Sequence, residues 1–242
     1  MKILGVDISS KSTGLALIED NKLLEYTKIN PTGTMSNSAK MFLFSVELDK
    51  FIQKHQPDYI GVEDVIQVSS VSITKILARF NGVALVCAYK YNKKEPRLFI
   101  PSEWKKMIGL HGIVKKCETQ LFVCKRFNLL PEEKINYYQK KIDEVFSLKE
   151  DPNIQEERKN LELLKKMKRK EKDKEKLTQI EKDIKSFEEK MKKSKKGLKN
   201  IIDKKFDEIS MEIYIETAIN EDVADSVGVS LAYQKELTTT KK

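Results

Sequence analysis

The first fourteen residues, MKILGVDISSKSTG, constrain the fold of this chain more than any other stretch. Residues 3–6 form a short apolar run typical of a strand, and the run ends on an acid, Asp7. A turn rich in Ser, Lys, Thr and Gly follows, and apolar residues resume at 15–18, which predicts a second strand folded back on the first. An acid at the end of a buried strand costs free energy unless a positive partner compensates it. We therefore expect either a divalent cation beside Asp7 or an Asp that caps its own turn.

The rest of the chain alternates between strand and helix patterns, which predicts an α/β fold. Short segments bounded by turn or Pro signals predict three more strands, and apolar residues recurring at three and four predict helices with polar caps. The expected strands are 22–29, 59–62 and 96–101, and the expected helices are 36–55, 69–91, a turn around Trp104, 114–127 and 221–237.

From residue 130 to about 207 the sequence is almost entirely charged and helix-forming. Apolar residues there alternate by threes and fours, which indicates a coiled-coil register in which Ser194 is the only lapse. We interpret the lysine runs as a solvated face, with DNA contact by the tip as the alternative. The predicted organisation is a core of residues 1–129 plus 211–237, a charged helical hairpin or coiled coil inserted at 130–210, and a disordered tail at 238–242. The seam residues are Leu177, Ile180, Ile184, Phe187, Met191, Leu198 and Ile201.

The net charge of +9 and the pI near 9.2 favour an acidic partner such as nucleic acid. Three cysteines, Cys87, Cys117 and Cys124, form no CxxC pair, so we expect reduced thiols in a cytoplasmic protein. The sequence shows no signal region and, by our interpretation, no apolar run that crosses a bilayer. We therefore expect no membrane partner.

Four acids fall where predicted core elements begin or end: Asp7, Glu63, Asp222 and Asp225. Asp7 and Glu63 close two strands expected to be neighbours, whereas Asp222 and Asp225 lie three apart on one helix face. Acids in a first helical turn can simply complement the helix dipole, and Asp64 or Glu221 can be confused with members of the set. Two Mg²⁺ ions about 3.5–4 Å apart need such a set of carboxylates. The joint pattern favours two-metal hydrolysis of a phosphodiester.

Three motifs in order, GVDISSKSTG at Asp7, QPDYIGVEDV at Glu63 with the helix ending ARFNGVALVCAYK, and DVADSVGVSLAY at Asp222, resemble RuvC-type Holliday-junction resolvases of the ribonuclease H-like superfamily. The likeness covers residues 1–129 and 220–234. It implies a mixed five-stranded sheet flanked by helices and a homodimer that nicks two symmetric strands of a four-way junction. It also implies two Mg²⁺ ions, replaceable by Mn²⁺, held by the four acids.

Two departures from the family pattern leave points open. Lys116 in GIVKKCETQ matches the family's assisting basic residue by register, but KKSKKGLKNIIDKKF reads like a second copy and makes Lys196 a competitor. Residues 65–67 hold no aromatic to stack on junction bases, so junction distortion and cleavage-sequence preference stay open. The long insertion suggests a divergent bacterial or phage-encoded branch, associated with the nucleoid, with a possible protein partner for the insertion. The expected DNA contacts are Lys11, Lys75, Arg79, Lys115 and Lys116.

Three alternatives compete with this interpretation. An ATP-binding module of the actin/sugar-kinase type shares the core fold, but it needs a second phosphate loop and a second large domain. A related nuclease acting on forks, flaps or RNA uses the same ions. A non-enzymatic scaffold working through the coiled coil leaves the cost of four clustered acids unexplained.

Overall fold

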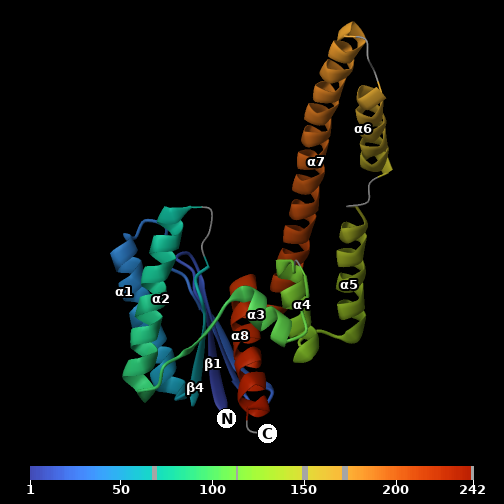
Figure 1. The fold of residues 1–242 in the computed structure, drawn as a ribbon. Helices are drawn as coiled ribbons and strands as arrows, with labels where there is room; N and C mark the ends of the chain where they lie inside the picture. Colours follow the sequence, from blue (N-terminus) through green and yellow to red (C-terminus); the bar gives the residue numbers. More distant parts are fainter. Residues whose placement is uncertain (67–69, 113, 149–151, 171–173, 241–242) are drawn as a thin grey trace. The chain divides into compact units, whose positions relative to one another are not determined.

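A computed structural model describes residues 1–66, 70–112, 114–148, 152–170 and 174–240 of the chain (Figure 1). The chain divides into two compact units. The first unit contains Met1–Ile135 and Ser210–Lys242, and the second contains Asn136–Ile209. We call them the sheet unit and the helical unit.

The sheet unit is built on a five-stranded sheet in the order β3-β2-β1-β4-β5. β1, β2 and β3 are antiparallel neighbours, whereas β4 runs parallel to β1 and β5 runs parallel to β4. The predicted mixed five-stranded sheet is therefore confirmed. The strands are β1 Lys2–Asp7, β2 Thr13–Glu19, β3 Lys22–Ile29, β4 Tyr59–Glu63 and β5 Arg97–Phe99.

Helices cover both faces of this sheet, because alternate strand residues point to opposite sides (Figure 1). Leu4 and Leu15 pack in a core with α1 and α2, whereas Ile3 and Ala16 pack in a second core with α4 and α8. The three cysteines are buried free thiols. The helices of the sheet unit are α1 Asn37–His55, α2 Val71–Asn92, α3 Pro101–Met107, α4 Lys116–Arg126 and α8 Glu221–Thr239.

Two glycines let α8 lie directly on the sheet. A Cβ on Gly5 would stand 1.9 Å from the backbone oxygen of Ser226, and a Cβ on Gly14 would stand 2.0 Å from the backbone oxygen of Asp222. Only a residue without a side chain allows backbones to approach this closely. The first turns of α8 are therefore fixed against β1 and β2.

Helix α2 corrects one expectation from the sequence. By length and composition alone it is apolar and long enough to cross a membrane, although we expected no such segment. One side of α2, including Phe80 and Ala84, packs in the core with the sheet and α1. The other side leaves Val86 and Tyr89 exposed. The apolar side chains on both sides of the helix account for its composition.

The helical unit contains most of three helices, α5 Glu132–Ser147, α6 Pro152–Lys170 and α7 Lys174–Thr217. Ion pairs from Lys165 to Glu188 (2.7 Å) and from Lys168 to Glu181 (2.9 Å) join α6 to α7. The rings of Phe146 and Phe206 pack with centroids 5.0 Å apart.

Several helix boundaries differ from the sequence-based ones. α7 continues without a break through residue 210, where we placed the end of the insertion, because Ile209 and Ile213 are both buried along it. α8 continues to Thr239, so residues 238 and 239 are helical rather than part of a disordered tail. Residues 241–242, and Ser69 at the predicted start of α2, lie outside the described residues.

Candidate active site

Asp7 and Glu63 end two adjacent parallel strands. The register pairs Val6 of β1 with Val62 of β4, so the next residue on each strand is an acid at the same sheet edge. Asp7 is only 8% exposed. Trp104 Nε1 on α3 donates a 2.7 Å hydrogen bond to Glu63 Oε2. This bond fixes the position of the Glu63 carboxylate beside α3.

Asp222 reaches this edge because of the close packing of α8. Gly14 pairs with Asp7 across β1 and β2, and the same glycine contacts the backbone of Asp222. Asn220 caps the helix by accepting from the Val223 N–H at 2.9 Å, and its Nδ2 donates to Asp222 Oδ2 at 3.0 Å. Residues from the two ends of the chain are thus brought side by side.

The four predicted acids form one electrostatic group. Burial, followed by the charges of Glu63, Asp225 and Asp222, raises the pKa of Asp7 well above its usual value. Burial and the charge of Asp225 raise the pKa of Glu63 to about 7, and burial raises the pKa of Asp225 to about 6. Burial also raises the pKa of Asp222. The charges of Glu63, Asp222 and Asp225 therefore make a neighbouring carboxyl group harder to ionise.

The chemistry of this donor set fits a divalent cation. Carboxylate oxygens are the ligands that hard cations prefer, and a cation removes the repulsion that raises these pKa values. Within the described ranges, no three Asp, Glu, His or Cys side chains stand in an arrangement that holds a metal ion.

Two lysines of the sheet unit act on the four acids. Lys116 pairs with Glu221, and its charge lowers the pKa of Asp222 and Asp225. The competitor Lys196 is an exposed residue of α7 in the helical unit.

Lys105 was missed from the sequence. Its charge lowers the pKa of Asp7, Glu63 and Asp225, and its Nζ lies 4.9 Å from the centroid of the Trp104 ring. Lys105 lies near Glu63 because β5 runs parallel to β4, so that the helix after β5 begins at the sheet edge where Glu63 lies. The sequence signal for this pairing is weak, since β5 has only three residues.

The acids next to the predicted set have local partners. Asp64 Oδ1 accepts the N–H of Val65 at 2.8 Å, and Glu221 pairs with Lys116. Asp64 is not among the charges that shift the pKa values of the four acids, whereas the charge of Glu221 raises the pKa of Asp222 and of Asp225.

The remaining predicted DNA contacts lie on three elements. Lys11 is exposed in the turn between β1 and β2, and Lys75 and Arg79 are exposed one turn apart on α2. Lys115 precedes α4, where its backbone N–H donates to the Glu118 carboxylate at 2.6 Å.

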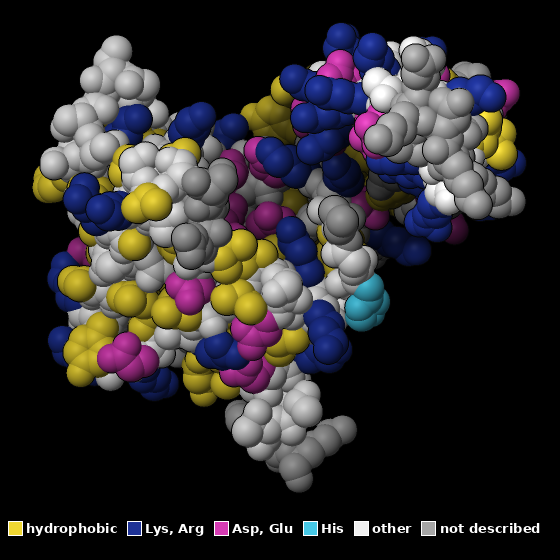
Figure 2. Space-filling model, turned by 45° about the horizontal axis from the view of Figure 1, so that its top comes forward, with side chains coloured by type: hydrophobic (Ala, Val, Ile, Leu, Met, Phe, Trp, Pro, Cys, Tyr) yellow, Lys and Arg dark blue, Asp and Glu magenta, His cyan; other side chains and the backbone are white. Residues whose placement is uncertain are grey.

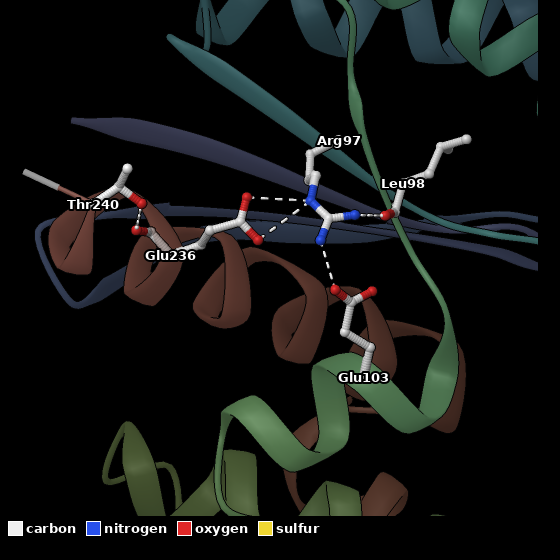
Figure 3. A network of polar contacts seen from close by, with 5 residues as sticks. All are labelled: Arg97, Leu98, Glu103, Glu236 and Thr240. Atoms are coloured by element: carbon white, nitrogen blue, oxygen red, sulfur yellow. Dashed lines mark hydrogen bonds and ion pairs between the residues drawn. The ribbon is translucent and has the colours of Figure 1, made fainter.

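A network around Arg97 joins the elements that carry the site (Figure 3). Arg97 Nε on β5 donates to both oxygens of Glu236 on α8, at 3.1 and 3.2 Å. Its Nη2 donates to Glu103 on α3 at 2.5 Å, and its Nη1 donates to the backbone oxygen of Leu98. One guanidinium thus ties the helix of Lys105 to the helix of Asp222 and Asp225.

The chain is similar to known proteins in sequence. A curated relative from Alkaliphilus oremlandii, crossover junction endodeoxyribonuclease RuvC, is 29% identical over 133 residues, which cover 53% of this chain and 80% of that protein. Its counterpart from Ruminiclostridium cellulolyticum is 27% identical over 133 residues, with the same coverage of both chains.

The chain is also similar in fold to two solved structures of RuvC from Thermus thermophilus. One, in complex with a Holliday junction substrate, has a TM-score of 0.48 and 18% identity, and covers 55% of this chain and 82% of that one. The other has a TM-score of 0.47 and 17% identity, and covers 56% of this chain and 88% of that one.

The family model described as crossover junction endodeoxyribonuclease RuvC matches residues 3–137. This match begins in β1, passes through Asp7 and Glu63, and ends in α5. Since it spans more than half of the chain, this protein belongs to the RuvC family of crossover junction endodeoxyribonucleases.

Proposed function

We propose that this protein is a metal-dependent endonuclease that nicks symmetric strands of four-way DNA junctions. The observation that carries the proposal is the coupling of four acids, drawn from both ends and the middle of the chain, in a member of the RuvC family. Buried like charges at one sheet edge destabilise the fold. A cation bound at a catalytic site would compensate this cost, and such charge clusters are typical of functional sites. The core carrying this activity comprises residues 1–129 and 211–237.

Asp7, Glu63, Asp222 and Asp225 would hold two Mg²⁺ ions, or Mn²⁺ in their place. Such ions lower the pKa of the attacking water and stabilise the leaving oxygen in an in-line displacement. The Trp104 N–H orients Glu63 through its 2.7 Å hydrogen bond. Lys105 and Lys116 add positive charge where a DNA phosphate approaches the acids.

The proposal includes a homodimer in the cytoplasm of a bacterial cell. Two symmetric nicks require two sites, and α1 and α2 leave apolar side chains on the surface that suit a second copy. Phe42 on α1 is 71% exposed and Val86 on α2 is 67% exposed, and Tyr89 on α2 is also exposed. Exposed apolar side chains of this size on neighbouring helices favour association.

One substrate panel tests the proposal. With Mg²⁺ present, we expect the protein to nick a synthetic four-way junction faster than a fork, a flap, a linear duplex or an RNA–DNA hybrid. On a plasmid with an extruded cruciform, paired sites predict linear product rather than nicked circles. Preferential cleavage of forks, flaps or the hybrid would assign the same site to another nuclease of the fold, and no cleavage of any substrate would refute the proposal.

Replacing Lys105 by Gln is expected to slow junction nicking about 10- to 100-fold, the range typical for loss of a group that acts on the ligands of a metal site. Because Lys105 lowers the pKa of three acids, its loss should also shift the acid limb of the pH–rate profile to higher pH. Lys106→Gln is the matched control, since Lys106 is the exposed neighbour and lowers none of those pKa values. Equal profiles for the two variants would remove Lys105 from the mechanism.

A further inference from the structure

A segment of α7 carries lysines without acids. From Lys190 to Ile202 the chain has six lysines and no Asp or Glu, whereas acids and lysines alternate on either side of it. Residues 136–209 of the helical unit hold 23 Lys and Arg against 17 Asp and Glu, so this unit carries +6 of the net +9. Figure 2 shows dark-blue basic side chains gathered over the helical unit. The positive charge is therefore concentrated in the inserted helices.

Four of these lysines lie on one face of the helix. Spacings of three, four and seven residues place side chains within about 100° of each other around a helix. All four lysines are exposed, whereas Met191 and Leu198 are partly buried. Met191 and Leu198 therefore lie on a different side of the helix. We call this face the lysine stripe, and it consists of Lys192, Lys195, Lys196 and Lys199.

Within the part of the chain that the structure describes, the stripe lysines have no counterions. The ion pairs of α7 among the described residues involve Glu181, Glu188, Glu216 and the Lys204–Glu208 pair, which lie to either side of the stripe. Across the described residues, no carboxylate lies within 4 Å of a stripe lysine. Like charges three and four residues apart repel, so the helix carries a local cost that a polyanion removes.

We propose that the lysine stripe binds the phosphate backbone of duplex DNA in an arm of the junction. The stripe lies on a segment of the chain that contains none of the four acids. Seven residues of helix span about 10 Å, which matches about three phosphates of one strand spaced about 3.4 Å apart along the axis. Lysines act on phosphates as point charges, so the contact reads no sequence. This inference rests on the proposed function for the identity of the polyanion and extends it to a second DNA-binding surface.

The test uses the full-length protein and a fluorescent linear duplex, with EDTA to prevent cleavage, over a series of NaCl concentrations. Replacing the stripe lysines by Gln should weaken duplex binding at least about tenfold at low salt and reduce the slope of log K against log[salt] by about 2–3, since each phosphate contact contributes about 0.9. Gln keeps helix propensity close to that of Lys, and circular dichroism checks the helix content.

A matched control removes the same charge from the same helix outside the stripe. It replaces four exposed lysines that alternate with acids, and we expect less than about a twofold loss of affinity. The control residues are Lys182, Lys185, Lys204 and Lys205. Equal losses in the two variants, or no loss in either, would overturn the proposal. A stripe variant that loses binding to phosphatidylglycerol vesicles but keeps duplex binding would also overturn it and assign the stripe to a lipid surface.

Nicking of the junction with Mg²⁺, measured on the same proteins, separates this inference from the proposed function. Stripe-dependent duplex binding without nicking would refute the nuclease and keep the DNA-binding stripe. Nicking with unchanged duplex binding in the stripe variant would refute the stripe alone.

Discussion

Replacing Asp7 by Asn abolishes junction nicking, by at least about a thousandfold, while binding of the junction stays within a few-fold of the unchanged protein. The large loss is expected because Asp7 is the most buried of the four acids and its pKa responds to the other three. An amide cannot supply the negative charge that holds a divalent cation, and metal catalysis contributes several kcal/mol, with each 1.4 kcal/mol worth tenfold in rate. Single-turnover cleavage and a mobility-shift assay measure the two effects.

Asp64→Asn is the control for this variant, since the carboxylate of Asp64, the acid next to Glu63, accepts the backbone N–H of Val65. We expect it to nick at a rate near that of the unchanged protein. Nicking by Asp7→Asn at an ordinary rate would exclude Asp7 from the chemistry, and the proposed mechanism with it.

The same Asp7→Asn substitution is expected to stabilise the metal-free protein. Because burial and like charges raise the folded-state pKa values of these acids, the folded state binds more protons than the unfolded one between about pH 4 and pH 7. Stability without metal therefore falls as pH rises through this window. Removing one charge from the cluster should recover about 1–3 kcal/mol at pH 8 and almost nothing at pH 4.

Thermal unfolding in EDTA at the two pH values measures this difference. Added Mg²⁺ should raise the melting temperature of the unchanged protein more than that of Asp7→Asn, because a ligand stabilises the state that binds it. A variant less stable than the parent at pH 8 would show that Asp7 serves the fold rather than a cation.

Replacing Gly5 by Ala is expected to cost about 3 kcal/mol or more of unfolding free energy. The added Cβ would stand 1.9 Å from the backbone oxygen of Ser226 and 2.8 Å from the backbone nitrogen of Ser230. Backbone atoms cannot rotate away as a side chain can, so α8 must move off the sheet. Chemical denaturation measures the loss. Junction nicking should also fall, since α8 carries two of the acids.

Gly82→Ala provides the opposite expectation. A Cβ on Gly82 meets nothing within 4 Å, and the residue lies inside α2. Alanine there should stabilise the protein by about 0.5–1 kcal/mol through helix propensity. If Gly5→Ala were as harmless as Gly82→Ala, close packing of α8 on β1 would not be what positions the acids.

The sequence could predict the parts of the fold that depend on local pattern. Two apolar runs joined by a Ser/Lys/Thr/Gly turn indicated the antiparallel pair of β1 and β2, and the position of Asp7 and Glu63 at the ends of apolar runs indicated a shared sheet edge. Periodicity likewise indicated the helices, with errors of a few residues at their ends. These features are local because strand and helix periods repeat within a few residues.

Contacts between distant segments could not be predicted in this way. Lys105 was overlooked because its relation to Glu63 depends on β5 pairing with β4, and three residues of strand give a weak pattern. The exposed apolar side of α2 was also missed, since composition does not say which side of a helix meets the core.

By itself the sequence determined the periodic elements, the acids at their ends and the acid-free lysine segment of α7, because each of these depends on residues close together in the chain. Only the tertiary structure decided that the close packing of α8 on Gly14 places Asp222 near Asp7, and that burial raises the pKa values of the acids. Both effects depend on backbone approach and on exclusion of water, and neither exists until segments more than two hundred residues apart in sequence are packed against each other.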